Sequence, residues 1–212
     1  MVATAGEPGD GFESIGTVRH RSAGQIESSN WSIGAETMDR DFTVYENWKE
    51  YLAPLGVKTA RIQSGWAKTE KVKGHYDWAW LDAIIFDMNK KKVRPWVCIC
   101  YGNPIYEGGG ETGLGGGMPT SDEAKKAWDA YVAAMVDRYK DHVDAWEIWN
   151  EPGLRSANPE NAYADLMIRT ATIIKERQPD AIVIGFGMAG IKLSWVDTVL
   201  KRLKEAGKID LI

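Results

Sequence analysis

One short stretch of this sequence combines a carboxylate, an amide and two indoles in a pattern suited to acid–base chemistry. It runs from Trp146 to Pro152 and reads WEIWNEP. The residues before Asn150 read as a buried strand, and Pro152 ends strand pairing because proline has no backbone donor. Glu151 is therefore expected at the tip of a strand, beside an amide and above an indole, where burial favours the protonated acid. A protonated carboxylic acid in that position can donate a proton to a leaving oxygen.

Two plainer interpretations of Glu151 compete with this one. The carboxylate could cap the following helix, or it could form an ion pair with Arg155. For a single glutamate such a structural role would be the ordinary interpretation. The complete string, with its amide and its proline, favours chemistry instead.

A glycine pattern near the end of the chain suggests a different class of enzyme. Gly185, Gly187 and Gly190 form a G-x-G-x-x-G that follows an expected strand, and Asp210 lies twenty residues after Gly190. This spacing is typical of dinucleotide binding and would indicate an NAD-dependent oxidoreductase. The phosphate-binding turn normally belongs to the first strand–helix unit of its domain, however, and here four units precede it.

The elements that position these residues alternate along the chain. Apolar runs predict strands at 32–35, 57–62, 93–101, 143–150, 181–184 and 209–212. Helical spacing or helix-start signals predict helices at 45–55, 78–91, 121–140, 159–178 and 193–206, with Asn158 as the cap before Pro159 at the first helical position. This alternation indicates a parallel α/β architecture of five and a half β/α units, preceded by an irregular lead-in over 1–29. Long segments after strands and short turns before them favour a closed barrel over an open sheet.

Composition excludes several other classes of protein. Hydrophobic residues make up 44% of the 212 residues and charged residues 26%, which is typical of a globular domain. With 26 basic and 30 acidic residues the net charge is −4, so no nucleic-acid partner is expected. The apolar runs are far shorter than the roughly 18 residues that a membrane helix needs, so no membrane partner is expected. The three histidines lack metal-ligand spacing, the two cysteines read as buried apolar residues, and no cofactor is implied. The first ten residues do not resemble a secretory signal, and the location of the protein stays open.

At the end of the fourth expected strand, Trp149-Asn150-Glu151-Pro152 resembles the retaining glycoside hydrolases of clan A. A second resemblance to clan members lies in the passage from Trp66 to Asp82 (W-x-x-x-E, then G-x-Y-D-W and L-D). Within the clan, the sequence E-x-W-N-E-P and the Tyr101-Gly-Asn103-Pro run are similar to glycoside hydrolase family 39, which includes β-xylosidases and α-L-iduronidases. Families 5 and 42 remain alternatives. The resemblance implies a (β/α)8 TIM barrel.

The resemblance also implies roles for individual residues in a retaining O-glycosidase acting on a β-linked sugar or oligosaccharide. Glu151 would be the general acid/base, Asn150 would bind the sugar 2-hydroxyl, and Arg61 would orient the nucleophile. Further carbohydrate-binding candidates are Trp66, Tyr101, Asn103 and Trp149.

The clan's nucleophile is a second glutamate on the seventh strand, whereas this chain ends in the sixth expected strand. We therefore expect the N-terminal portion of a longer enzyme, inactive alone, or a chain that self-associates or receives the rest of the barrel from a complementing chain. A non-catalytic sugar-binding barrel fragment is the remaining alternative.

Overall fold

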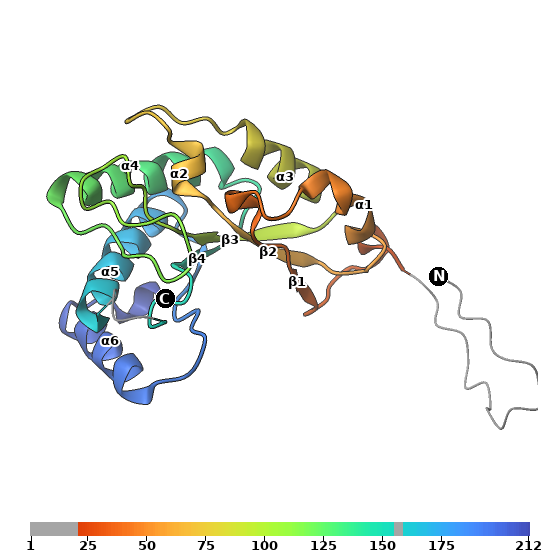
Figure 1. Cartoon of the computed structure of the whole chain (residues 1–212). Helices are drawn as coiled ribbons and strands as arrows, with labels where there is room; N and C mark the ends of the chain where they lie inside the picture. Colours follow the sequence, from red (N-terminus) through yellow and green to blue (C-terminus); the bar gives the residue numbers. More distant parts are fainter. Residues whose placement is uncertain (1–20, 155–158) are drawn as a thin grey trace, which may run out of the picture.

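A sheet of five parallel strands runs through the molecule, and the helices lie along one of its two faces (Figure 1). The structure, a computed structural model, describes residues 21–154 and 159–212. The strands are β1 (Ser32–Gly34), β2 (Thr59–Gln63), β3 (Arg94–Ile99), β4 (Ala145–Ile148) and β5 (Ile182–Ile184). The helices are α1 (Lys49–Leu52), α2 (Trp66–Thr69), α3 (Ala79–Lys90), α4 (Asp122–Tyr139), α5 (Glu160–Arg177) and α6 (Leu193–Glu205).

The order of the strands distinguishes the two parallel architectures that the sequence left open. The sheet order is β1-β2-β3-β4-β5, and every neighbouring pair is parallel. A doubly wound sheet reverses its strand order at a switch point, whereas a (β/α)8 barrel adds each strand beside the previous one. The described residues therefore form five consecutive units of a barrel.

The two faces of the sheet differ in burial because only one of them is covered. Ile62, Val97 and Ile148 point toward the helices and are fully buried. Arg61 lies directly beside Trp96 across β2 and β3, and both residues are half-buried on the opposite face. That second face corresponds to the interior of a barrel, and it carries the polar residues of the sheet.

Helix ends follow the expected chemistry with one difference. The Ser121 side chain accepts the Ala124 backbone N–H at 3.1 Å and caps α4, and Gly207 ends the α6 segment with φ 63°. Pro159 is the cap of α5 rather than its first helical residue, because its ψ of 153° is extended. The expected cap Asn158 lies outside the described residues.

Two other expected elements were wrong. The helix expected over 45–55 is split into a 3-10 turn at Tyr45–Asn47 and the short α1, because Trp48 has a non-helical ψ of −7° at φ −138°. The strand expected over 209–212 is instead a 3-10 turn at Ile209–Leu211. The Lys208 N–H donates to the Leu203 carbonyl, so this segment folds back onto the end of α6 rather than pairing with a strand. The chain thus has five complete units and no sixth strand among its described residues.

Part of the expected lead-in is ordered against the end of the barrel where the strands begin. A 3-10 turn at Ala23–Gln25 buries Ala23, whose backbone N–H donates to the Ala53 carbonyl at 2.8 Å. The Lys58 ammonium donates to the Ala23 carbonyl at 2.9 Å. Residues 1–20 of the expected lead-in lie outside the described part of the chain.

The expectation of two buried cysteines is confirmed. Cys98 and Cys100 are both free thiols with no exposed surface. In the described ranges 21–154 and 159–212, no helix is long and apolar enough to cross a membrane.

Candidate active site

Arg61 is the centre of the polar network at the carboxyl end of the sheet. It reaches Glu147 on β4 with two hydrogen bonds, from Nε to Oε2 at 2.6 Å and from Nη2 to Oε1 at 2.8 Å. Nη1 donates to Glu36 after β1 at 2.7 Å, and Nη2 also donates to the Asn150 side-chain oxygen at 2.9 Å. The Trp96 indole N–H adds a bond to Glu147 at 3.2 Å. One guanidinium on β2 therefore joins side chains that follow or belong to β1 and β4.

The ionisation of this network follows from its contacts. Burial alone would lower the pKa of Arg61, but hydrogen bonds to Glu147 and Glu36 hold that pKa above its ordinary value. Burial raises the pKa of Tyr101, so its phenol stays protonated. The network presents a permanent cation bound by two carboxylates.

Asn150 is fixed from two sides. Its oxygen accepts from Arg61, and its nitrogen donates to the Tyr101 hydroxyl at 2.8 Å. Tyr101 also accepts from Gln63 at 3.1 Å, and Gln63 in turn accepts from Arg40 at 2.8 Å. A side-chain amide has two N–H groups, of which the bond to Tyr101 uses one. The amide is thus oriented in advance, as a binding group for a ligand needs to be.

Glu151 is presented by an unusual backbone. Trp149 and Glu151 both adopt positive φ values, 65° and 50°, which side-chain-bearing residues seldom do. The Glu151 backbone N–H donates to the Gly187 carbonyl after β5 at 2.8 Å, and its carbonyl accepts from Leu154 at 3.0 Å. Glu151 is half-buried and lines a cleft of about 430 Å³ together with Arg61 and other residues from three strand ends. The remaining lining residues are Trp96, Glu147, Asn150, Ile184, Gly185, Phe186, Gly187 and Met188.

The other residues expected from the sequence divide into two groups. Tyr101 and Trp149 are buried under the cleft, with ring centroids 6.1 Å apart, and Tyr101 supports Asn150. Trp66 and Asn103 lie in a separate cluster around buried Glu70, which accepts the Trp66 indole N–H at 2.5 Å. The Asn103 side chain donates to the Glu70 backbone carbonyl at 2.8 Å. The structure therefore brings Arg61, Asn150, Tyr101 and Glu151 together, whereas Trp66 and Asn103 stabilise the loops behind them.

Sequence reasoning missed the partners of Arg61. Glu36, Trp96 and Glu147 belong to the network, yet none was expected to bind Arg61. One signal was present, because Glu147 and Trp149 are two positions apart on the expected strand and so share a face. The pairing of that face with Arg61, 86 positions earlier in the chain, depends on strand register.

The structure gives two glycines of the G-x-G-x-x-G pattern, Gly185 and Gly187, a packing role. A Cβ on Gly187 would lie 2.1 Å from the Glu147 side chain, and one on Gly185 would lie 2.0 Å from Met167. The space beside these two glycines is therefore filled by the protein's own side chains. The sequential strand order and the 3-10 turn that holds Asp210 also differ from a dinucleotide-binding fold.

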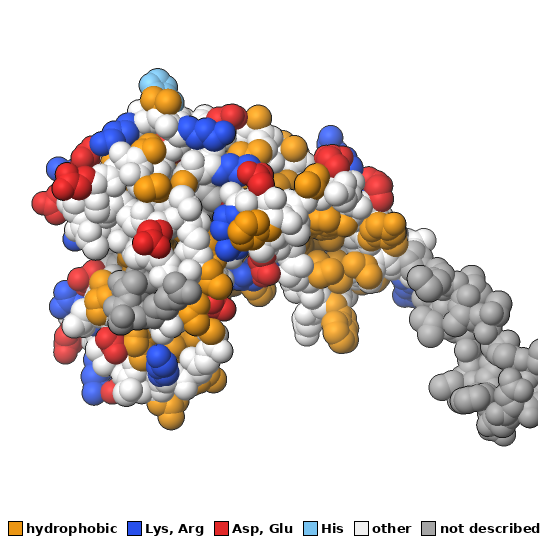
Figure 2. Space-filling view, in the orientation of Figure 1, with side chains coloured by type: hydrophobic (Ala, Val, Ile, Leu, Met, Phe, Trp, Pro, Cys, Tyr) orange, Lys and Arg blue, Asp and Glu red, His pale blue; other side chains and the backbone are white. Residues whose placement is uncertain are grey.

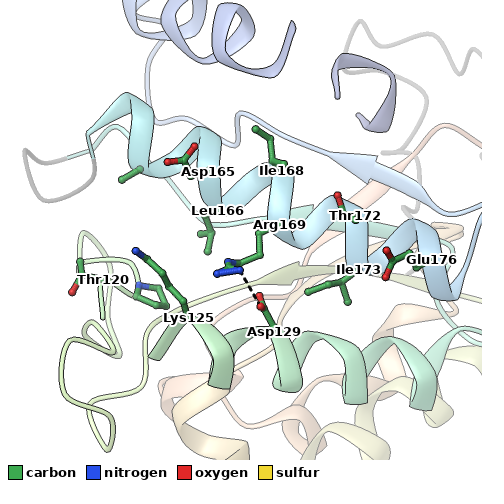
Figure 3. A pocket seen from close by; sticks show the side chains of 12 residues that line it. Thr120, Lys125, Asp129, Asp165, Leu166, Ile168, Arg169, Thr172, Ile173 and Glu176 are labelled. Carbon is green, nitrogen blue, oxygen red and sulfur yellow. Dashed lines mark hydrogen bonds and ion pairs between the residues drawn. The ribbon is translucent and has the colours of Figure 1, made fainter. Parts of the chain in front are cut away.

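A larger hollow of about 830 Å³ lies between α4 and α5, away from the strand ends (Figure 3). An ion pair between Arg169 and Asp129, 3.1 Å apart, spans the two helices at this place. Across residues 21–154 and 159–212, no group of three or more His, Cys, Asp or Glu side chains is placed to hold a metal ion.

Comparisons with known proteins support the fold. A family 39 β-xylosidase from Caulobacter crescentus superimposes with a TM-score of 0.64 at 23% identity, covering 83% of this chain and 43% of that one. A family 39 glycoside hydrolase from Bacteroides cellulosilyticus WH2 gives 0.63 at 21% identity, covering 84% and 36%. The fold is a partial (β/α)8 barrel. A psychrophilic family 10 endo-β-1,4-xylanase gives 0.57 at 21% identity, covering 82% and 60%.

The chain is much shorter than the family 39 structures that it resembles. This chain spans less than half the length of the two family 39 structures. No family model and no curated protein matches the sequence. The likeness therefore defines the architecture of the chain.

Proposed function

We propose that this chain forms the acid/base-bearing part of a retaining O-glycoside hydrolase that acts on a β-linked sugar or oligosaccharide. The observation that carries the proposal is the position of Glu151 in a cleft at the tip of β4, directly after an asparagine held by Arg61 and Tyr101. In such barrels, ligands bind where the strands end. The resemblance of the W-N-E-P string to clan A supports the same role.

Each group would act in one step of a double displacement. Glu151 would protonate the leaving oxygen and later deprotonate the attacking water. The second N–H of Asn150 would donate to the sugar 2-hydroxyl, an interaction that strengthens in the transition state. Arg61 would hold a nucleophilic carboxylate ionised and in place.

A retaining mechanism needs two carboxyl groups about 5–5.5 Å apart. Glu147 is only 3% exposed and accepts from both Arg61 and Trp96, so we assign it to positioning Arg61. Glu36 is half-buried, and its carboxylate accepts from Arg61. We propose that the nucleophile comes from a seventh strand, which would approach Arg61 from the open side of the network.

The test is Glu151→Gln in a polypeptide that includes the seventh strand. We expect a loss of about 10²- to 10⁴-fold in turnover for sugar leaving groups, because the proton donor is removed. Activated aryl glycosides should lose much less, since their leaving oxygen needs little protonation. Azide should restore the second step and yield a glycosyl azide.

A merely structural Glu151 would behave differently. Equal losses on good and poor leaving groups, with a lower melting temperature and no azide product, would contradict the assignment. Glu36→Gln is the matched control, because it removes a carboxylate from the same network without removing the proton donor. We expect no azide rescue for Glu36→Gln.

We further propose that the described units require a covering partner, either another copy of the chain or a segment that completes the barrel. One edge of β1 and one edge of β5 have no neighbouring strand among the described residues. Apolar side chains gather near β1 and α1, where Trp31, Tyr51 and Leu55 are exposed (Figure 2). Unpaired edges and apolar surface promote association. Sedimentation of the 212-residue chain should show self-association, and a stable monomer that binds no hydrophobic dye would contradict this.

A further inference from the structure

We propose that Tyr163 is a positioning residue for Glu151, because its hydroxyl is inserted between the ends of β4 and β5 and sets their separation. This inference rests on the proposed function, since it concerns where the acid/base carboxyl stands. Tyr163 lies on α5 and has no exposed surface, so it acts on Glu151 through the backbone and not on a ligand.

The phenol of Tyr163 occupies a place where the sheet would otherwise make a direct hydrogen bond. β4 and β5 are parallel, and the Ile182 N–H donates to the Asp144 carbonyl at 2.8 Å. Such bonds recur every second residue of a parallel ladder, so the Phe186 N–H would donate to the Ile148 carbonyl. The structure has two bonds in series instead. The Phe186 N–H donates to the Tyr163 hydroxyl at 2.9 Å, and that hydroxyl donates to the Ile148 carbonyl at 3.0 Å.

The chemistry of a buried phenol suits this place. A hydroxyl donates one hydrogen bond and accepts others at the same time, which a ladder interrupted on both sides requires. Burial raises the pKa of Tyr163, so the phenol keeps the proton that it donates. A Cβ on Gly185 would lie 2.0 Å from Met167 and 3.7 Å from the Tyr163 hydroxyl. Two side chains of α5 therefore lie directly against the start of the β5 loop.

Beyond the phenol, the two segments meet again in a different register. The ladder would pair the Asn150 N–H with the Phe186 carbonyl, but that carbonyl accepts the Met188 N–H at 2.7 Å. The Glu151 N–H donates to the Gly187 carbonyl at 2.8 Å, one residue further along both segments. The left-handed φ of 61° at Phe186 accompanies this break in the ladder. The separation that the phenol sets therefore decides where Glu151 stands relative to the β5 side of the cleft.

The first experiment measures hydrogen exchange of backbone amides by NMR in the 212-residue chain and in Tyr163→Phe. The phenyl ring of the variant still separates the strands but leaves the Phe186 N–H without its acceptor. We expect exchange at Phe186 and Glu151 to become about tenfold faster or more. Tyr139→Phe is the matched control, because it removes another buried phenol hydroxyl, which donates to Asp82 at 2.7 Å. Exchange at Phe186 and Glu151 should not change in this control.

The wild-type chain offers a second measurement that does not depend on the folding of a variant. A buried hydroxyl proton exchanges slowly with water, and the one on Tyr163 should give a nuclear Overhauser contact to the Phe186 amide proton. Absence of this contact would overturn the inserted phenol.

The second experiment measures turnover in a polypeptide that includes the seventh strand. Asn150 is held by Arg61 and Tyr101, so sugar binding should persist, and Tyr163→Phe should keep KM within about twofold. The misplaced proton donor should lower kcat about tenfold or more for sugar leaving groups and much less for aryl glycosides. Met167→Leu repacks α5 under the same loop but keeps the phenol, and its kcat should fall less than about twofold.

Failure of this inference is distinguishable from failure of the proposed function. Unchanged exchange at Phe186 and Glu151, or equal effects in Tyr139→Phe or Met167→Leu, would overturn the positioning role alone. The same holds if Tyr163→Phe raises KM with kcat unchanged, or lowers kcat equally for both classes of leaving group. A wild-type polypeptide that includes the seventh strand and hydrolyses no glycoside would overturn both proposals.

Discussion

The hollow between α4 and α5 and the cleft at the tip of β4 differ in what their walls do. The hollow is the larger of the two, about 830 Å³ against about 430 Å³, but its central ion pair joins two helices on the outside of the barrel. In the cleft, one half-buried cation binds side chains that follow or belong to β1 and β4, and a half-buried glutamate stands beside an oriented amide. Convergent polar groups therefore identify the site better than volume does.

The largest expected effect is a difference in stability between variants that break the ion pair in the cleft and variants that break the ion pair in the hollow. Arg61→Ala leaves Glu147 as an unpaired, buried charge, and we expect it to lower the free energy of unfolding by about 3 kcal/mol or more. Arg169→Ala removes a pair whose side chains are 37% and 30% exposed, and we expect a loss of about 1 kcal/mol or less. Urea denaturation of both variants measures the difference. Similar losses would show that the Arg61 network is no more buried than an outer-surface pair.

A smaller effect separates two glycines on the β5 loop. Gly187→Ala places a methyl group against the Glu147 carboxylate, and we expect it to lower stability by about 1–3 kcal/mol and to disturb the Arg61 network. Gly190→Ala meets nothing within 4 Å, so its effect should stay within about 0.5 kcal/mol. Thermal melting distinguishes the two. If both variants fold normally and lose an affinity for NAD, the dinucleotide interpretation of these glycines would be right.

The smallest expected effect is a pH dependence of stability that arises from Asp129 in the hollow. Burial raises the pKa of Asp129 above 3.8, with Arg169 acting in the opposite direction. The folded state then binds more protons than the unfolded state just above pH 3.8, so stability falls as the pH rises through that window. Asp129→Asn should remove this decline, which we expect to be less than about 1 kcal/mol.

This prediction is checked by measuring the free energy of unfolding between pH 3.5 and 7 for the wild type and for Asp129→Asn. The difference between the two proteins is then compared across that pH range. Asp165→Asn is the control, because Asp165 is an exposed carboxylate of the same hollow. An identical pH profile for wild type and Asp129→Asn would refute the assignment.

Local patterns in the sequence were enough to predict most of the fold. The helices that became α3, α4, α5 and α6 have clear apolar periodicity or helix-start signals, and β3 is an apolar run, so each was predicted within a few residues. The expected strand at 209–212 was wrong, because a short apolar run forms a strand only where a neighbouring strand accepts it. Trp66 and Trp149 illustrate a second limit. An indole has the same sequence signature in a core as on a sugar-binding surface, and both of these are in the core.

The candidate site could be predicted only where its residues are neighbours in the sequence. Asn150, Glu151 and Pro152 are consecutive, so the position of the proposed acid/base at a strand tip follows from a single string. The attachment of Arg61 to Glu147 and Glu36 depends on the register of several strands, and Glu36 carried no signal of its own. The sequence therefore predicts the proposed reacting groups better than it predicts the side chains that hold them in place.

The left-handed backbone at Trp149 and Glu151 bears on whether this chain is a relic that merely binds sugars. Each residue with a side chain in that conformation is destabilised by roughly 1–2 kcal/mol, and glycine would relieve the strain. Such a penalty is a sizeable share of the roughly 5–15 kcal/mol that separates a folded domain from its unfolded state. At Trp149 the burial of a large indole in the core offsets this penalty. For half-buried Glu151 the proposed proton transfer would be a gain in function that the strained backbone makes possible.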